Sequence, residues 1–250
     1  MNIDVYTVCW NEMAIIPFCI DYWKRFARHV YVFDNGSTDG SVEYLKQYDW
    51  ITVQPFGNKD CKQNLENSRI KNEKWKGSDA DYVVCCDIDE LIIGNNIKEK
   101  FEECKKTGYT IIEFDWLSLV SEVKPEYEDG KYLHEISPKV LDHGNCCKTM
   151  VFSPKDIKSI GYSVGAHKCT PKGNVKKTFL KEIYCLHINN SLSFEYKLQR
   201  YKLQSQRLSK EDKKKKWGIH YSQSEKMLRD EYNKNIKKSR NINEFLKKTV

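Results

Sequence analysis

Two aspartates follow the most apolar segment of the chain, in the sequence YVVCCDIDEL (82–91). Asp87 and Asp89 stand two residues apart, so their side chains project to the same side if the extended backbone continues through them. Two carboxylates this close repel each other, and a divalent cation such as Mg²⁺ or Mn²⁺, which prefers oxygen ligands, relieves the repulsion. We therefore expect a divalent-cation site at Asp87 and Asp89, and such an ion can bind a diphosphate.

A second polar segment, VFDNGSTDGS (32–41), follows another apolar run. Asp34 and Asn35 stand where that run ends, a suitable place to hydrogen-bond a nucleotide base or ribose. The segment is not a calcium-binding EF-hand loop, because Gly36 takes the third position, which needs an oxygen-bearing side chain, and Asp39 takes the sixth, which needs glycine.

Two common nucleotide-binding motifs are absent from the sequence. The first apolar segment runs into VCWNEM (8–13), which has none of the glycines of a GxGxxG dinucleotide-binding turn. The phosphate-binding pattern GxxxxGK[ST] occurs nowhere in the chain. An NAD-binding domain of that type and a P-loop nucleotidase are therefore excluded.

Apolar runs alternate with segments of helical periodicity along the first half of the chain. Such alternation is typical of an α/β fold with a mostly parallel sheet covered by helices on both faces, in which ligands bind beyond the carboxyl ends of the strands. After about residue 120 the pattern weakens. We expect strands over 3–9, 29–35, 51–56, 81–92, 109–115, 147–152 and 182–188, and helices over 12–26, 42–48, 62–74, 97–106 and 193–209.

The composition is that of a folded protein. Hydrophobic residues make up 40% and aromatic residues 12% of the 250 residues, enough for a substantial core. No apolar run reaches the roughly 18 residues of a membrane-spanning helix, and the first residues lack the pattern of a secretory signal. The ten cysteines form no CxxC pair, which favours a reducing compartment and therefore a cytoplasmic location.

Charge is distributed unevenly along the chain. Residues 197–250 hold 17 Lys or Arg against 6 Asp or Glu, whereas residues 1–196 hold 25 against 29. The basic tail is either a set of solvated helix faces or a surface for an anionic partner, such as a lipid headgroup region or an acidic glycan. The second interpretation places the protein peripherally on an anionic membrane surface.

Three motifs in this order and spacing resemble glycosyltransferase family 2 and its close relatives: VCWNE (8–12), VFDNGSTDGS (32–41) and CDIDEL (86–91). The resemblance implies a GT-A fold and transfer of a sugar from a nucleotide-diphosphate donor to a glycan or lipid-linked acceptor. It also implies inversion at the anomeric carbon and a divalent ion, Mn²⁺ or Mg²⁺, at the DxD motif. The likeness covers residues 3–93 well and continues more thinly through 147–154, 165–169 and 185–200.

The resemblance also divides the chain. Residues 1–192 correspond to the GT-A catalytic domain, with 1–93 as the nucleotide-sugar-binding half and 94–192 as the acceptor-side half. Residues 193–250 form a basic helical extension. No nucleic acid is expected as a partner.

Candidate site residues follow from the matched motifs. The resemblance puts Asp87 near the ribose or the metal ion and Asp89 on the metal ion. Family members often carry an aspartate where this chain has Asn35, which can hydrogen-bond a base but brings no negative charge. The residues implied near the base and ribose are Val8, Glu12, Asp34 and Asn35.

Basic side chains are candidates for the diphosphate. Lys62 and Arg69 belong to the polar helix before the DxD strand, where they either meet the diphosphate or are surface charges. Lys148, in KTMVF, could assist the leaving group. His187 resembles the late histidine that completes the ion's coordination in many GT-A enzymes; the alternative is a hydrogen-bonded core residue.

An inverting transfer also needs a carboxylate near the acceptor hydroxyl. Asp115, in EFDWLS, is the candidate base, and the ring of Trp116 could stack on a sugar; the alternative is a strand-end aspartate beside a core tryptophan. The other carboxylates that remain open for this role are Glu113, Asp142 and Glu195.

Two other functions are compatible with parts of the sequence. The first is a metal-dependent phosphohydrolase or nuclease whose basic tail grips a polyanion; it leaves 32–41 without a role. The second is a non-catalytic sugar-binding module, against which the intact aspartate pair argues. The metal cluster of the first would comprise Asp87, Asp89, Glu90, His167 and His187.

Overall fold

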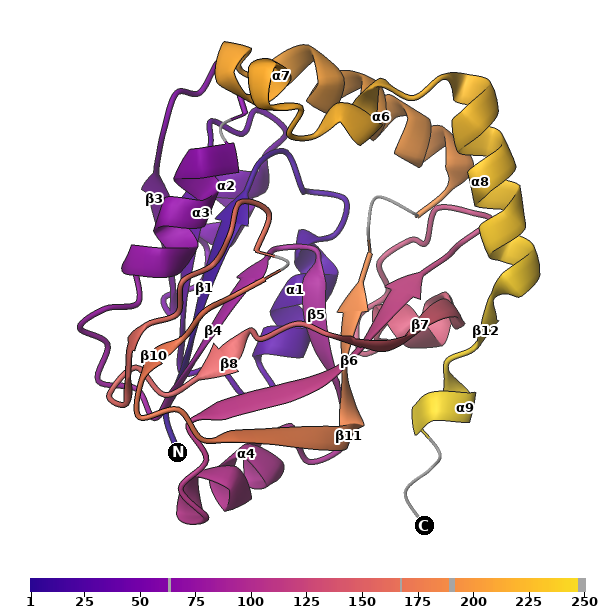
Figure 1. Cartoon of the computed structure of the whole chain (residues 1–250). Helices are drawn as coiled ribbons and strands as arrows, with labels where there is room; N and C mark the ends of the chain where they lie inside the picture. Colours follow the sequence, from indigo (N-terminus) through magenta and orange to yellow (C-terminus); the bar gives the residue numbers. More distant parts are fainter. Residues whose placement is uncertain (63, 167, 189–191, 247–250) are drawn as a thin grey trace.

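The computed structural model describes residues 1–62, 64–166, 168–188 and 192–246 (Figure 1). Its largest element is one mixed sheet, in which ten of the described strands take part. Two further strands, β9 (Ile157–Ser159) and β10 (Lys172–Gly173), pair with each other. The strands of the large sheet are β1 (Ile3–Cys9), β2 (His29–Asp34), β3 (Ile51–Pro55), β4 (Tyr82–Asp87), β5 (Glu90–Gly94), β6 (Ile111–Leu119), β7 (Lys139–Cys147), β8 (Val151–Phe152), β11 (Lys177–His187) and β12 (Arg240–Asn241).

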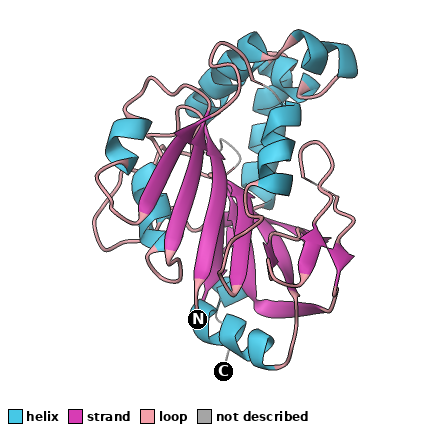
Figure 2. Cartoon of the chain, turned by 90° about the vertical axis from the view of Figure 1, so that its left-hand side faces the viewer, coloured by secondary structure: helices cyan, strands magenta, loops and turns pink. Residues whose placement is uncertain are grey.

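Helices follow most of the early strands and dominate the end of the chain. Figure 2 shows helices beside the sheet and at one end of its strands. None of those within the described residues combines the length and apolarity that crossing a bilayer requires. The helices are α1 (Ile16–Trp23), α2 (Ser41–Leu45), α3 (Asn64–Glu73), α4 (Ile97–Lys106), α5 (Leu133–Ile136), α6 (Phe194–Arg207), α7 (Lys210–Lys215), the 3₁₀ helix η1 (Ile219–Ser222), α8 (Glu225–Lys238) and α9 (Asn243–Leu246).

The parallel part of the sheet runs in the order β4-β1-β2-β3. Val8 pairs with Asp87, and Cys9 pairs with Asp34, so these strands end at the same edge. The predicted α/β fold with a mostly parallel sheet is therefore confirmed, and it is the arrangement that the resemblance to GT-A enzymes implies.

Strand β1 shows why both faces need helices. Alternate side chains point to opposite faces of a strand, and every residue of β1 is buried. Val5 and Cys9 pack in the core cluster that contains the apolar residues of α1 and α4. Tyr6 and Val8 pack in a second cluster with Trp75 and Ile70 on the α3 side.

The segment 81–92 differs from the prediction of one continuous strand. It divides into β4 and β5 at a turn through Ile88 and Asp89. The backbone N–H of Asp87 donates to the Glu90 carboxylate (2.9 Å), which stabilises the turn. Asp87 and Asp89 therefore flank a change of direction rather than sharing one face of a strand.

After the turn, β5 pairs with β11, which comes from far along the chain. The antiparallel register places His187 opposite Glu90, and the N–H of Ile188 donates to the Asp89 carbonyl (2.9 Å). β11 also pairs with β6 in parallel, as Cys185 lies opposite Trp116. The pairing of β11 with β5 and β6 places both His187 and Trp116 beside the DxD turn.

The helices α6 and α7 lie across the carboxyl end of the parallel strands, and α8 runs down beside β7 (Figure 1). Each of the three is capped by a serine hydroxyl that accepts a backbone N–H: Ser193 accepts from Tyr196, Ser209 from Asp212 and Ser224 from Met227. Helix α6 is not a solvated helix throughout, because Lys197 and Arg200 are 1% and 4% exposed. The tail predicted as a helical extension therefore packs over the edge where the strands end.

Candidate functional site

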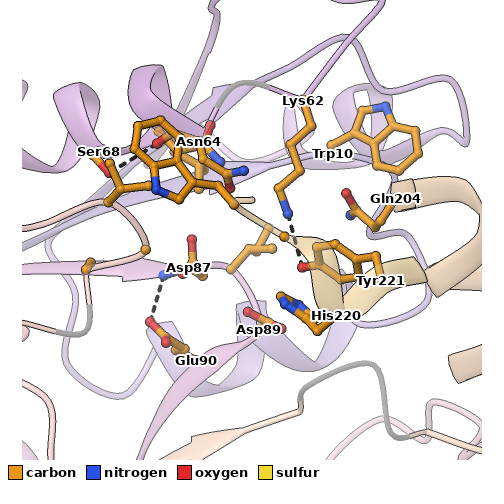
Figure 3. A pocket seen from close by; sticks show the side chains of 18 of the residues that line it. Trp10, Lys62, Asn64, Ser68, Asp87, Asp89, Glu90, Gln204, His220 and Tyr221 are labelled. Atoms are coloured by element: carbon orange, nitrogen blue, oxygen red, sulfur yellow. Dashed lines mark hydrogen bonds between the residues drawn. The ribbon is translucent and has the colours of Figure 1, made fainter. Parts of the chain in front are cut away.

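A cavity of about 660 Å³ opens at the carboxyl ends of β1, β2 and β4 (Figure 3). Its walls come from the loop after β1, helix α3, the β4–β5 turn, β6 and the C-terminal segment from α6 to α8. Lys62 and Tyr221 reach toward the turn that carries Asp87 and Asp89, and the Lys62 ammonium donates to the Tyr221 hydroxyl (3.1 Å). The predicted location of the site is the location of the cavity.

Two buried lysines hold Asp87. The Lys71 ammonium lies 2.6 Å from one carboxylate oxygen of Asp87, and the Lys148 ammonium lies 3.8 Å from the other. Burial opposes ionisation of Asp87, but these two positive charges outweigh it and hold the pKa of Asp87 below its usual range. Lys148 also donates to Glu90, so the turn is braced from both ends.

Asp89 has a different partner. Its carboxylate oxygen lies 3.3 Å from Nε2 of His187. Burial lowers the pKa of His187, but the negative charge of Asp89 raises it by more. The net result is a pKa above the usual range. The other ring nitrogen, Nδ1, is buried and has no hydrogen-bond partner.

Asp89 and His187 fit a divalent cation better than Asp87 does. They offer an oxygen and a nitrogen ligand side by side, a set that Mn²⁺ accepts while keeping positions for phosphate oxygens. Asp87 already faces Lys71 and Lys148, whose charges compete with a cation. In the described part of the chain no three His, Cys, Asp or Glu residues are grouped to hold a metal, so an ion here would depend on a bound diphosphate for further ligands.

Asn35 lines the cavity, but its side chain is engaged within the protein. Its amide nitrogen donates to the carbonyls of Phe56 and Asn58 (both 3.1 Å), and its oxygen accepts from Arg207 (2.9 Å). The guanidinium of Arg207 also lies 3.7 Å from the centre of the Trp10 ring. Asn35 therefore positions an arginine, and Arg207 and Trp10 present the surface at this end of the cavity.

Glu12 joins the loop after β1 to helix α6. The guanidinium of Arg200 donates to its carboxylate and to the carbonyls of Asn11 (2.8 Å) and Trp10 (3.2 Å). The Arg200 side chain is buried, and only 12% of the Glu12 side chain is exposed. The pair fixes α6 over the cavity.

Three predicted site residues do not line the cavity. Asp34 accepts the N–H groups of Gly36 (2.8 Å) and Ser37 (2.9 Å), so it stabilises its own loop. Arg69 points to solvent with 66% of its side chain exposed and pairs with Glu66. Asp115 precedes Trp116 on β6, and because neighbouring residues of a strand face opposite sides, the tryptophan lines the cavity and the aspartate does not.

The remaining sequence candidates divide into those outside the cavity and those that line it. The alternatives for the catalytic base, Glu113, Asp142 and Glu195, do not line the cavity. His167, which the phosphohydrolase hypothesis requires, lies outside the described residues. The predicted site residues that do line it are Val8, Glu12, Asn35, Lys62, Asp87, Asp89, Lys148 and His187.

Sequence reasoning missed most of the cavity's upper wall. The sequence did not indicate Lys71 as a site residue because it belongs to a polar helix, but the residue is buried, with 3% exposed. The segment after α7 belongs to the basic tail, for which the sequence left open both a solvated surface and an anionic partner. The aromatic residues that follow the lysines of α7 were a usable signal. The missed residues include Tyr201, Gln204, Arg207, Lys216, Trp217, His220, Tyr221 and Glu231.

The cavity carries surplus positive charge. Every lining carboxylate has a cationic partner within 4 Å: Glu12 with Arg200, Asp87 with Lys71, Asp89 with His187, Glu90 with Lys148, and Glu231 with Lys197. Lys62, Arg207 and Lys216 also line the cavity, and among the described residues none of these three has a carboxylate partner. An anionic ligand can neutralise them.

No protein-family model and no curated protein sequence matches the chain. Among solved structures it is similar to residues 1–349 of S. aureus TarS, with a TM-score of 0.48 and 12% identity over 80% of this chain and 64% of that one. The same protein in complex with UDP gives a TM-score of 0.45 and 11% identity over 80% and 64%. Its complex with UDP-GlcNAc gives 0.44 and 12% over 82% and 66%. The chain thus spans less than two thirds of the length of these structures.

Proposed function

We propose that this protein is a glycosyltransferase that moves a sugar from a nucleotide-diphosphate sugar to a glycan or lipid-linked acceptor. The observation that carries the proposal is the cavity at the carboxyl ends of the parallel strands. It combines the Asp87–Asp89 turn with three cations that have no carboxylate partner among the described residues. A nucleoside diphosphate brings the two to three negative charges that such a cavity lacks. The motif resemblance implies inversion at the anomeric carbon.

Unpartnered polar atoms support a nucleotide in the part of the cavity between α3 and α6. The amide nitrogen of Asn64 and the amide oxygen of Gln204 are buried without a hydrogen-bond partner among the described residues, and both residues line the cavity. A buried polar atom without a partner costs about 1–3 kcal/mol, which a ligand recovers when it supplies one. A nucleobase offers both an acceptor and a donor.

In this mechanism the charged side chains divide the work. Lys62 and Arg207 attract the diphosphate, and Asp87, kept ionised by Lys71, accepts hydrogen bonds from the ribose hydroxyls. Asp89 and His187 would hold a divalent cation, and such an ion would supply Lewis-acid stabilisation of the negative charge on the leaving diphosphate. Helix α6, which covers the cavity, excludes water from the anomeric carbon of the donor sugar.

The phosphohydrolase alternative has less support. Its metal cluster needs Asp87 and Glu90, but both carboxylates are already paired with lysines. A non-catalytic module would share the cavity, and only turnover separates it from a transferase.

The test is a thermal-shift and turnover assay with UDP-glucose, UDP-N-acetylglucosamine and GDP-mannose, each with Mn²⁺ or with EDTA. One nucleotide sugar should raise the Tm and be hydrolysed slowly to the nucleoside diphosphate. Lys62→Ala should weaken its binding about tenfold, the loss of one charge-assisted contact. Lys106→Ala, on the exposed end of α4, is the matched control. Binding without turnover would indicate a sugar-binding module, and no shift with any donor would refute the proposal.

A further inference from the structure

Trp116 holds a defined position beside the DxD turn. It lies on β6, and its ring centre is 4.9 Å from that of His187 and 5.4 Å from that of His143. The rings are tilted by 57° and 43° respectively, so Trp116 already packs against two imidazoles. The edge of the indole, which carries the N–H group, is therefore the part whose role is unexplained.

The indole nitrogen of Trp116 is buried and has no hydrogen-bond partner in the part of the chain that the structure describes. Indole N–H is a donor only, and buried tryptophans usually find an acceptor for it. Among the described residues five side chains carry such an unpartnered buried atom, and four of them, Asn64, Trp116, His187 and Gln204, line this cavity. The concentration in one place indicates that a ligand supplies the missing partners.

The position of Trp116 determines which part of the ligand it meets. Its neighbour His187 lies 3.3 Å from Asp89, at the turn where the diphosphate and its cation are proposed to bind. The nucleoside is proposed to bind in another part of the cavity, between α3 and α6, beside Asn64 and Gln204. In a nucleotide sugar, the group on the far side of the diphosphate from the nucleoside is the sugar ring.

We propose that Trp116 recognises the sugar that is transferred, by donating its indole N–H to a hydroxyl or acyl oxygen of that sugar. The inference rests on the proposed function and specifies it further, since it separates sugar recognition from nucleotide recognition. It also replaces the expected stacking of the Trp116 ring by a hydrogen bond from its edge. Loss of the N–H should weaken binding of a nucleotide sugar and leave binding of the nucleoside diphosphate unchanged.

The experiment compares Trp116→Phe, which removes the N–H and keeps an aromatic ring, with wild type. Titration calorimetry measures affinity for UDP-N-acetylglucosamine, UDP-glucose or GDP-mannose, whichever wild type binds best, and for the corresponding nucleoside diphosphate. We expect about tenfold weaker binding of the nucleotide sugar and an unchanged nucleoside diphosphate affinity, which also reports an intact cavity. Trp50→Phe, outside the cavity, should match wild type for both.

A second measurement uses deoxy analogues of the same nucleotide sugar, and for an N-acetylated sugar the analogue without the acetyl group. If a sugar oxygen accepts from Trp116, wild type loses about tenfold with one analogue and Trp116→Phe loses nothing further with it. Equal losses for nucleotide sugar and nucleoside diphosphate in Trp116→Phe, or no loss at all, would overturn the inference alone. Wild type that binds no nucleotide sugar would overturn the proposed function together with it.

Discussion

At the scale of single residues, the two aspartates of the DxD motif have different surroundings. Asp87 lies within 4 Å of the ammonium groups of Lys71 and Lys148. Among the described residues, His187 is the only basic side chain within 4 Å of Asp89. A fixed ammonium group and a metal ion compete for the same carboxylate. Asp87 is therefore suited to hydrogen-bond the donor, and Asp89 is suited to bind the cation.

Asp89→Asn should abolish the effect of Mn²⁺, because the amide keeps the shape of the side chain and removes its charge. We expect the Mn²⁺-dependent rise in Tm with nucleotide sugar to disappear and turnover to fall about a hundredfold or more. Asp49→Asn is the control, since Asp49 is exposed and does not line the cavity, and its turnover should stay near that of wild type. Wild-type turnover in Asp89→Asn, or activity that EDTA does not reduce, would contradict the assignment.

At the scale of elements, the β5–β11 pairing assembles the site. It requires the close approach of the two backbones at Gly94, which pairs with Ile183 and has a φ of +135°. A Cβ added at Gly94 would lie 2.6 Å from the carbonyl oxygen of Glu182. A larger residue there would therefore push β11, and with it His187, away from the turn.

Gly94→Ala should lower the free energy of unfolding by about 2 kcal/mol or more, from the strained φ and the clash with backbone together. Gly130→Ala is the matched control: Gly130 also has a positive φ (+79°), but nothing lies within 4 Å of an added Cβ. Its cost should be only about 1 kcal/mol. Urea denaturation measures both, and equal costs would show that the backbone contact at Gly94 is unimportant.

At the scale of the whole molecule, the basic C-terminal segment has two kinds of cation. Arg200 and Arg207 face inward: Arg200 fixes α6 to the loop after β1, and Arg207 lines the cavity. Lys213, Lys214 and Lys215 of α7 are exposed. Part of the positive charge of the segment therefore serves contacts within the protein. The exposed lysines are available for the proposed contact with an anionic membrane.

Replacing Lys213, Lys214 and Lys215 by Gln should weaken binding to phosphatidylserine-containing vesicles, by about 1 kcal/mol per charge at low salt and less as salt increases. Sedimentation with vesicles at two salt concentrations measures the effect. The control removes three lysines from other elements, Lys98, Lys106 and Lys158, and should bind as wild type does. Absence of binding in wild type, or binding that salt does not alter, would eliminate the membrane contact.

Local patterns were sufficient for the α/β alternation and for placing Asp87, Asp89 and Asn35 at one edge of the sheet. Strand formation depends on nearby apolar residues, and parallel strands align their carboxyl ends. The same patterns could not reveal the turn inside 81–92, because that turn is maintained by Glu90, Lys148 and the distant strand β11.

Only the tertiary structure decided which side chains share the cavity. Asp115 and Trp116 are adjacent in sequence, and the packing of β6 between β7 and β11 determines which of them faces the site. Arg207 and Tyr221 line the cavity because α6 and the segment after it fold back over the strands. The Glu12–Arg200 ion pair holds α6 in this position. Contacts between segments so far apart leave no periodic trace in the sequence, since each partner alone is compatible with a solvated surface.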